Sequence, residues 1–420
     1  MKKIVIVGSG LTGCLTAFKI AKKYPNFQIT LIESSNKILQ SFDSIKFSEA
    51  KLNNGYHALE INRCKDLFSF FTKNLKLKFI CRKGNRLIII NNSLLKENLE
   101  EKFYPEKLRK CFKKKKILSN NLNVFYKNIL GSFKKTIKET SKRYSNKISE
   151  VLNFFIPWFL PKEFIYISKD EGNTFREKIK KDNKKNLVGI PNNGLVESIS
   201  KSFKKKLLEI SNLKIKLNTS VVYNNKEIYF LNNFKKLNMT YDYLFICTSP
   251  IFFLKKDNKI LLNRLTNNQK FFVCCVVEFD KIIKRDFTEI ICMIRNFREM
   301  SRFSKINFKK NQKKCLIEFI FNDLKTFKKK ITKKRIESIL YNIAGEKNDF
   351  KIIDYKCTRK IFFPEKSVIN ECKEVVYRIT KKMNTGSKVF SISNFGPINM
   401  SKSWNESENN IKILKNELSR

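Results

Sequence analysis

Histidine is almost absent from this chain of 420 residues, since His57 is the only one. The eleven cysteines include no Cys-x-x-Cys pair. Histidines and paired cysteines are the usual zinc ligands, so no metal site is expected. Acid–base chemistry that needs several histidines is excluded as well. The scattered cysteines favour buried, reduced residues of a cytoplasmic protein over a disulfide framework.

The sequence also lacks a long apolar run. No eighteen consecutive residues are apolar, so no membrane-spanning helix is predicted. Lys2 and Lys3 precede a short apolar stretch, as in an export signal. Three glycines interrupt that stretch, and a helical pattern continues beyond it through Ala21. An export signal does not explain these features.

Acidic residues are few: Asp and Glu total 38 against 87 Lys and Arg, which gives a formal net charge of +49. Such a charge can attract nucleic acid or an anionic membrane surface. However, the lysines are spread along the whole chain, and the abundance of Lys, Asn, Ile and Phe matches AT-rich codons. No nucleic-acid-binding module accompanies them, so no nucleic-acid partner is predicted. An anionic small-molecule substrate and peripheral membrane contact remain compatible with the charge, and the oligomeric state stays open.

Glycine is scarce too, with 12 in the chain, yet three glycines lie within six residues near the N-terminus. A β-branched run, Lys3–Val7, predicts a strand buried on both faces. Apolar residues then recur at helical spacing from Leu15 to Ala21, and Gln28–Ile32 predicts a second strand that ends at Glu33. This order is typical of a dinucleotide-binding βαβ unit.

Each residue type in this unit has a physical role. Gly8 permits the tight turn, Gly10 lets a pyrophosphate approach the backbone, and Gly13 lets the helix pack closely on the strand. Glu33, twenty residues after Gly13, can accept hydrogen bonds from both ribose hydroxyls and disfavours the 2′-phosphate of NADP. A glycine-rich turn without a ligand is the alternative. The predicted dinucleotide-binding residues are Gly8, Gly10, Leu11, Thr12, Gly13 and Glu33.

Four further blocks lie at Asn54–His57, Gly189–Val221, Tyr241–Pro250 and Lys388–Met400. Together with the glycine loop they resemble the flavin-containing amine oxidase and protoporphyrinogen oxidase superfamily, which also includes UDP-galactopyranose mutase. The glycine loop alone does not choose between NAD and FAD, whereas this resemblance implies FAD. It also implies an α/β fold: a Rossmann-like FAD-binding domain with an inserted mixed α+β substrate domain.

The resemblance also implies roles for single residues. His57 matches a Gly-x-His segment beside the flavin ring, although a lone histidine is as often a structural hydrogen-bonding residue. Arg359 lies in an arginine-then-proline stretch near the substrate, and the backbone of Val221 matches an adenine contact. The strand–turn–helix that closes the FAD site contributes Asn394, Asn399 and Met400.

Two segments depart from the family pattern. Lys37–Phe42 lacks the Gly-Gly-Arg-like element expected after the ribose-binding acid, and Ser393–Asn394 replaces a glycine followed by an acidic residue or arginine. Both segments correspond to positions near the pyrophosphate and ribityl chain, so the flavin half of the site is less well supported than the adenosine half. The last forty residues contain no cysteine, so a covalent cysteinyl flavin is not expected.

On this reading the FAD-binding domain is discontinuous and comprises residues 1–60, 186–252 and 384–420. The substrate domain comprises residues 61–185, expected to be largely helical, and residues 253–383. The second of these segments begins with predicted strands at 271–279, 289–294 and 315–321, and a helix is predicted over 333–343.

The leading functional hypothesis is an FAD-dependent oxidoreductase in which His57 and Arg359 line the substrate site. A flavin carries the redox chemistry itself, so the scarcity of histidine is no obstacle. One alternative is a redox-neutral enzyme similar to UDP-galactopyranose mutase that acts on a nucleotide sugar. Another is a dinucleotide-binding protein without catalytic activity. The sequence does not identify the substrate or the electron acceptor.

Overall fold

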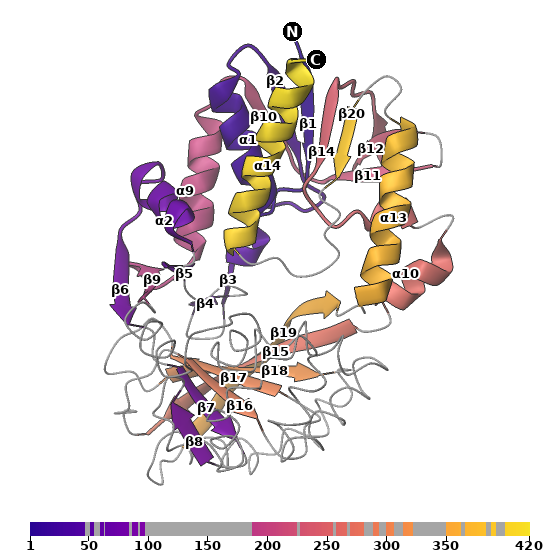
Figure 1. Ribbon diagram of the computed structural model, residues 1–420. Coiled ribbons are helices and arrows are strands. Elements are labelled where there is room, and N and C mark those ends of the chain that lie inside the picture. The colour runs from indigo at the N-terminus through magenta and orange to yellow at the C-terminus, as the bar shows by residue number, and fades with distance from the viewer. Residues whose placement is uncertain are drawn as a thin grey trace, which may run out of the picture.

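Figure 1 shows a computed structural model of the chain. The structure describes residues 1–46, 51–53, 59–62, 64–83, 86–90, 93–96, 187–224, 227–254, 258–266, 269–280, 289–293, 300–305, 314–321, 350–362, 366–383, 388–391 and 400–420.

A five-stranded parallel sheet forms the centre of the part of the molecule that is uppermost in Figure 1, with strand order β10-β2-β1-β14-β20. Its strands come from three distant parts of the chain: β1 (Lys3–Val7), β2 (Gln28–Ile32), β10 (Leu213–Lys216), β14 (Tyr243–Ile246) and β20 (Lys388–Ser391). Alternate residues of a strand point to opposite faces. In β1, Ile4 and Ile6 therefore enter one hydrophobic core, whereas Val5 and Val7 enter another. The prediction that this strand is buried on both faces is confirmed.

Helices cover one face of this sheet and close the first core. Figure 1 shows them next to one another on that side: α1 (Leu11–Lys23), α2 (Lys65–Lys73), α9 (Glu197–Leu208) and α14 (Met400–Leu418). Aromatic side chains join all four of them, since the Phe70 ring centroid of α2 lies 5.1 Å from Phe18 of α1, 5.2 Å from Phe203 of α9 and 5.9 Å from Trp404 of α14. This packing fixes α1 and α14 relative to the ends of the strands.

The second core lies on the opposite face of the sheet. A three-stranded antiparallel sheet and further helices cover it: β11 (Thr219–Tyr223), β12 (Ile228–Asn232), β13 (Lys235–Leu237), the 3-10 helix η3 (Ile251–Leu254), α10 (Lys259–Thr266) and α13 (Lys366–Met383). The parallel sheet is therefore a middle layer between two coverings, which is the doubly covered arrangement that parallel strands require.

A second, seven-stranded sheet lies apart from the first, with strand order β19-β15-β18-β17-β16-β7-β8. Its strands are β7 (Arg86–Ile90), β8 (Ser93–Lys96), β15 (Gln269–Phe279), β16 (Glu289–Met293), β17 (Met300–Lys305), β18 (Lys314–Phe321) and β19 (Phe350–Phe362). The three strands predicted at the start of the 253–383 segment are confirmed as β15, β16 and β18. Because β7 pairs with β16 in parallel, the two segments between the parts of the first sheet share this second sheet.

The described part of the 61–185 segment contains strands where a largely helical structure was expected. After α2 come β6 (Phe79–Lys83), β7 and β8, and β6 pairs with β9 (Leu187–Pro191). The run Leu-Ile-Ile-Ile at 87–90 is mostly β-branched, which favours a strand. Two shorter antiparallel pairings are also present. β3 (Ser44–Lys46) pairs with β4 (Lys51–Asn53), and β5 (Leu59–Glu60) pairs with β9. A 3-10 helix, η1, spans Gln40–Phe42. The rest of this segment and the helix predicted over 333–343 lie outside the described residues.

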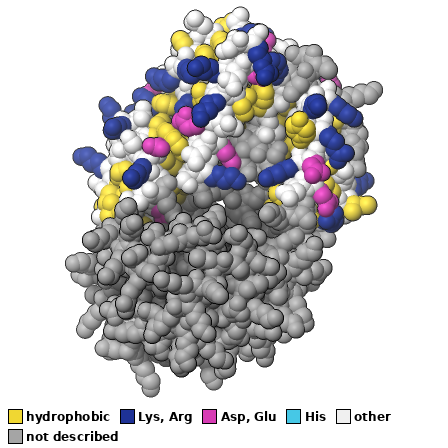
Figure 2. Space-filling model, in the orientation of Figure 1, with side chains coloured by type: hydrophobic (Ala, Val, Ile, Leu, Met, Phe, Trp, Pro, Cys, Tyr) yellow, Lys and Arg dark blue, Asp and Glu magenta, His cyan; other side chains and the backbone are white. Residues whose placement is uncertain are grey.

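The predicted fold class is confirmed, because a Rossmann-like α/β unit is joined to a second, mixed unit. The proposed domain boundaries stay a prediction. None of the helices in the described ranges combines the length and the apolar composition needed to cross a bilayer. Figure 2 shows the described Lys and Arg side chains scattered over the visible face, without a single dominant patch. Among the cysteines whose side chains are described, Cys14, Cys64, Cys247 and Cys372 are buried, Cys81 is exposed, and none of the five forms a disulfide.

Candidate dinucleotide-binding site

The glycine loop lies at the carboxyl end of β1, where the chain turns from strand to helix. Gly8 has φ +92°, a conformation that side chains other than glycine rarely adopt, and its N–H donates to the Ile32 carbonyl oxygen at 2.9 Å. A Cβ on Gly8 would also lie 2.7 Å from the Cβ of Thr248. The turn between β1 and α1 therefore requires glycine at this position.

Gly13 allows the first turn of α1 to lie directly against this loop. A Cβ on Gly13 would lie 1.8 Å from the carbonyl oxygen of Gly8, far inside van der Waals contact. That oxygen belongs to the backbone, so no side-chain rotation could relieve the overlap. The close packing of helix on strand thus depends on this glycine.

Gly10 differs from the other two glycines because it faces open space. It precedes α1 with extended backbone (φ −64°, ψ 179°), and none of the described atoms lies within 4 Å of where a Cβ would be. No side chain in the described part of the chain caps this helix end, and its first turn holds no acidic residue. The unpaired N–H groups at a helix N-terminus attract phosphate, so this open surface fits a pyrophosphate.

Glu33, at the end of β2, points back to the glycine loop. Its Oε2 accepts hydrogen bonds from the Ser9 N–H and the Ser9 hydroxyl, both at 2.8 Å. Its Oε1 accepts from the Ser34 hydroxyl at 3.1 Å and the Ser35 N–H at 3.0 Å. Partial burial by itself raises the pKa of the Glu33 carboxyl, but the hydrogen bonds from Ser9 and Ser35 outweigh it and leave the pKa below its ordinary value. The group is therefore a carboxylate at neutral pH.

These four donors are of two kinds. The N–H groups of Ser9 and Ser35 are fixed by the backbone and orient the carboxylate. The hydroxyls of Ser9 and Ser34 can rotate, and each occupies an acceptor position of the carboxylate. The arrangement fits the ribose of a dinucleotide if these two hydroxyls turn aside.

The segment after Glu33 keeps a glycine-like backbone although it contains no glycine. Leu39 has φ 54° and ψ 41°, which is a left-handed conformation. Its N–H donates to the Ser9 carbonyl oxygen at 2.9 Å, and its side chain is buried with those of Ile38 and Phe42. Packing of these three side chains offsets a conformational cost of about 1–3 kcal/mol. Although this segment lacks the Gly-Gly-Arg-like element, its backbone still lies against the glycine loop.

Helix α14 runs parallel to α1 and begins farther out. The Thr12 hydroxyl lies 3.5 Å from a Glu406 carboxylate oxygen, and the Asn410 amide donates to the Thr16 hydroxyl at 3.1 Å. Six residues of α14 precede Glu406, whereas one residue of α1 precedes Thr12. The difference of five residues places the start of α14, at the buried Met400, about 7.5 Å beyond the start of α1.

A dinucleotide could therefore meet two helix N-termini in succession. Asn410 of α14 contacts Cys247 at the end of β14, which lies on the opposite side of β1 from β2 and Glu33. The first half of a dinucleotide would lie at Glu33 and Gly10, and the second half would lie toward α14. Asn394 and Asn399, predicted for the same turn, lie outside the described residues.

Val221 is brought near the same end of the sheet. The Thr219 N–H at the start of β11 donates to the Glu33 carbonyl oxygen at 2.8 Å, and Val221, two residues farther along, is half-buried opposite Phe230. Arg359 lies instead in the seven-stranded sheet, in β19 opposite Phe272, and only its backbone is described. His57 lies outside the described residues. The roles predicted for all these residues stay predictions.

One serine that the sequence did not indicate, Ser249, also lies near the glycine loop. Ser249 follows β14, which pairs with β1, and its neighbour Thr248 lies against Gly8. The hydroxyl oxygens of Ser249 and Ser44 are buried without a hydrogen-bond partner among the described residues. β14 lies on the opposite side of β1 from β2, and ligands of such sheets bind where the strand order reverses. Hydroxyl residues at the carboxyl end of the strand beside β1 were the signal that could have identified Ser249.

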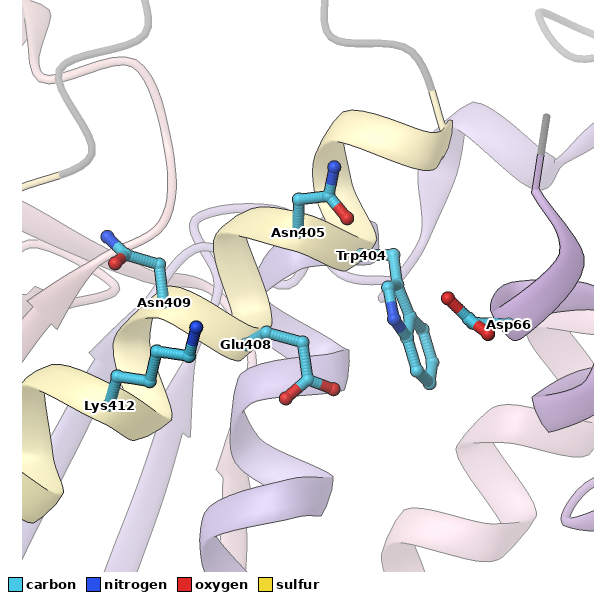
Figure 3. A pocket seen from close by; sticks show the side chains of 6 residues that line it. All are labelled: Asp66, Trp404, Asn405, Glu408, Asn409 and Lys412. Atoms are coloured by element: carbon cyan, nitrogen blue, oxygen red, sulfur yellow. The ribbon is translucent and has the colours of Figure 1, made fainter.

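A separate groove of about 580 Å³ lies on the outer side of α2 and α14. Figure 3 shows the Trp404 ring beside Asp66, with Asn405, Glu408, Asn409 and Lys412 along α14. The Lys19 ammonium lies 3.5 Å from the centre of the Trp404 ring and 2.6 Å from the Glu408 carboxylate. Burial lowers the pKa of Lys19, although Glu408 opposes this effect. Lys19 thus connects α1 to Trp404 and Glu408, two of the residues of α14 that line the groove.

Comparison with known proteins supports the Rossmann-like unit and extends the likeness to the whole chain. Residues 6–73 match the family described as the NAD(P)-binding Rossmann-like domain. In sequence, no curated protein matches the chain.

Solved structures with a similar fold include a candidate protoporphyrinogen oxidase from Exiguobacterium, with 12% identity, a TM-score of 0.59 and 99% of each chain covered. A reduced UDP-galactopyranose mutase has 12% identity and a TM-score of 0.62, with 99% of this chain and 94% of the mutase covered. A redesigned putrescine oxidase has 12% identity and a TM-score of 0.57, with 99% of each chain covered. The chain therefore has the Rossmann-based fold of amine oxidase-like proteins such as protoporphyrinogen oxidase, putrescine oxidase and UDP-galactopyranose mutase, as the sequence resemblance predicts.

Proposed function

We propose that this protein is an FAD-dependent oxidoreductase of the amine oxidase and protoporphyrinogen oxidase type. The observation that carries the proposal is the succession of Glu33, the open backbone at Gly10 and the advanced N-terminus of α14. A pyrophosphate needs only one helix N-terminus. A second one about 7.5 Å farther along suits a cofactor whose other half gains negative charge when it is reduced, such as a flavin.

The residues of the chain would divide the work of holding the cofactor. The Glu33 carboxylate would accept the ribose hydroxyls, and the N–H groups at the start of α1 would bind the pyrophosphate. The Ser249 hydroxyl, which has no hydrogen-bond partner within the described ranges, would offer a donor beside β1. When bound, FAD supplies the hydride-accepting chemistry. His57 and Arg359 are proposed to orient the substrate and to move or stabilise its charge.

The spectrum of the purified full-length protein tests the cofactor. We expect a yellow protein with a flavin-type visible spectrum, or a colourless one that becomes yellow when FAD is added and the excess is removed. FAD released by denaturation should match the protein concentration. A protein that stays colourless after incubation with FAD but binds NAD would overturn the proposal.

The fate of electrons distinguishes an oxidase from a mutase-like enzyme. An oxidoreductase should be bleached by its substrate without oxygen and should regain its colour with an electron acceptor. Primary amines, polyamines and porphyrinogens are the substrate classes to screen first, because solved proteins of this fold include such oxidases in name. A protein that converts a nucleotide sugar only after flavin reduction, without consuming an acceptor, would favour the mutase-like alternative.

Replacing His57 by alanine tests the proposed role of the single histidine. If His57 moves a proton or polarises the substrate, we expect the rate of substrate-dependent flavin bleaching to fall about 100-fold. The flavin spectrum and FAD content should stay the same, because the proposed role concerns the substrate. His57→Asn, which keeps a hydrogen-bonding side chain, separates a structural from a chemical role. Unchanged bleaching by the alanine variant, with flavin bound, would contradict the assignment.

A further inference from the structure

The turn between β12 and β13 carries an aromatic residue in an unfavourable backbone conformation. Asn232 pairs with Lys235, so only Asn233 and Phe234 form the turn, and their φ values are 46° and 66°. Two-residue turns with both φ values positive strongly prefer Asn-Gly, and a bulky residue in the second position is strained. The first position here follows that preference, and Phe234 does not.

The Phe234 ring gains no packing in return. It is 98% exposed, the highest value among the exposed large hydrophobic side chains of the described residues. The turn that carries it is nevertheless firmly held, because the Asn232 amide donates to the Leu217 carbonyl oxygen at 3.0 Å and to the Thr219 hydroxyl at 2.9 Å. The ring therefore projects into solvent from a fixed position.

Positive charge follows the ring directly. Lys235 and Lys236 are both exposed, and Lys236 reaches Glu227 at 3.3 Å across the surface of the hairpin. The chain as a whole carries a formal net charge of +49. An anionic surface would be attracted to this face, and the ring would be the first apolar group to reach it.

We propose that the β12–β13 turn docks the protein on an anionic membrane surface, with the Phe234 ring in the interfacial layer and Lys235 and Lys236 at the headgroups. The partner is lipid because the apolar surface is one ring flanked by polar residues, whereas a stable protein interface needs a far broader patch. An exposed ring with adjacent lysines supplies both contributions to peripheral membrane binding, burial of apolar surface and attraction to anionic lipid. This property is independent of the proposed redox function.

Co-sedimentation of the purified full-length protein with vesicles tests the proposal. We expect binding to vesicles of equal parts phosphatidylcholine and phosphatidylglycerol, and much weaker binding to phosphatidylcholine alone. Phe234→Gly should lower the partition coefficient about tenfold, because it removes the ring from the apolar layer. Since glycine accepts the observed φ, this hairpin should stay at least as stable, which a urea denaturation curve checks. Replacing Lys235 and Lys236 by glutamine should weaken binding about fivefold for each lysine.

Ile260→Ser is the matched control. Ile260 is 80% exposed, follows the exposed Lys259 and lies on α10, outside the hairpin. We expect this variant to bind vesicles as the unmodified protein does. The proposal is overturned if the unmodified protein does not prefer anionic vesicles, if Phe234→Gly binds them equally well, or if Ile260→Ser loses as much binding.

Discussion

Gly13→Ala should destabilise the protein by about 3 kcal/mol and remove dinucleotide binding with it. The new Cβ would lie 1.8 Å from the Gly8 carbonyl oxygen, so α1 or the loop must move by more than an ångström. Both are held in place: the Gly8 N–H is bonded to Ile32, and Leu15 and Phe18 of α1 are buried in the core. Urea denaturation followed by circular dichroism measures the loss.

Gly10→Ala is the matched comparison in the same loop. Its Cβ would meet none of the described atoms within 4 Å, and the backbone of Gly10 is extended. We expect the stability to stay within about 0.5 kcal/mol of the original, or to rise slightly because alanine restricts the unfolded chain. FAD affinity should nevertheless fall at least about tenfold, because a methyl group would occupy the path of the pyrophosphate.

The pair of variants separates folding from binding. If Gly13→Ala kept its full stability, α1 could not lie as close to the glycine loop as the structure places it. If Gly10→Ala bound FAD normally, the pyrophosphate would lie elsewhere than over this residue. A loss of stability by Gly10→Ala would instead show that the open space is filled in the folded protein.

The βαβ unit was predictable because its constraints are local. The predicted strands Lys3–Val7 and Gln28–Ile32 coincide with β1 and β2, since runs of apolar residues between polar ends leave little choice of boundary. The glycines lie where the turn and the helix contact require them. The family resemblance assigned two distant strands, β14 and β20, to the same domain. The structure confirms this, because β14 pairs with β1 and β20 pairs with β14.

Features that depend on distant contacts were not predictable. Leu39 adopts a left-handed conformation because its side chain and its bond to Ser9 stabilise it, and no local signal marks a leucine for that role. The parallel contact of α14 with α1 joins residues almost 400 positions apart, such as Thr12 and Glu406. Pairing of β7 with β16 likewise joins two segments that the sequence separates by about 200 residues.

The candidate site was predicted unevenly for the same reason. The residues predicted for the adenosine half all lie in one continuous segment, Gly8–Glu33, which is fully described. The predicted flavin half draws on His57 and Asn394, which lie outside the described residues, and on Met400, which begins α14. Ser9 and Ser34 escaped notice because serine carries no motif signal. Only the geometry shows that their hydroxyls bond the carboxylate.

Glu33→Gln should weaken FAD binding about 100-fold. Glutamine keeps one acceptor oxygen and replaces the other by an NH₂ group, which cannot accept a hydrogen bond from ribose. The NH₂ group would also face one of the two backbone N–H groups, of Ser9 or Ser35, that now orient the carboxylate. Isothermal titration of the apo-protein with FAD measures the loss.

Ser34→Ala should leave the affinity for FAD unchanged or increase it. The exposed Ser34 hydroxyl donates to Glu33 Oε1, so a ribose hydroxyl must displace it before it can bind there. Removing this competitor leaves the orienting Ser35 N–H in place, and we expect FAD to bind as tightly as before or a few-fold more tightly. The contrast between the two variants identifies what Glu33 does. If both weakened FAD equally, the serine would serve to hold the carboxylate, and if neither did, Glu33 would be a structural partner of Ser9 and not a ligand of ribose.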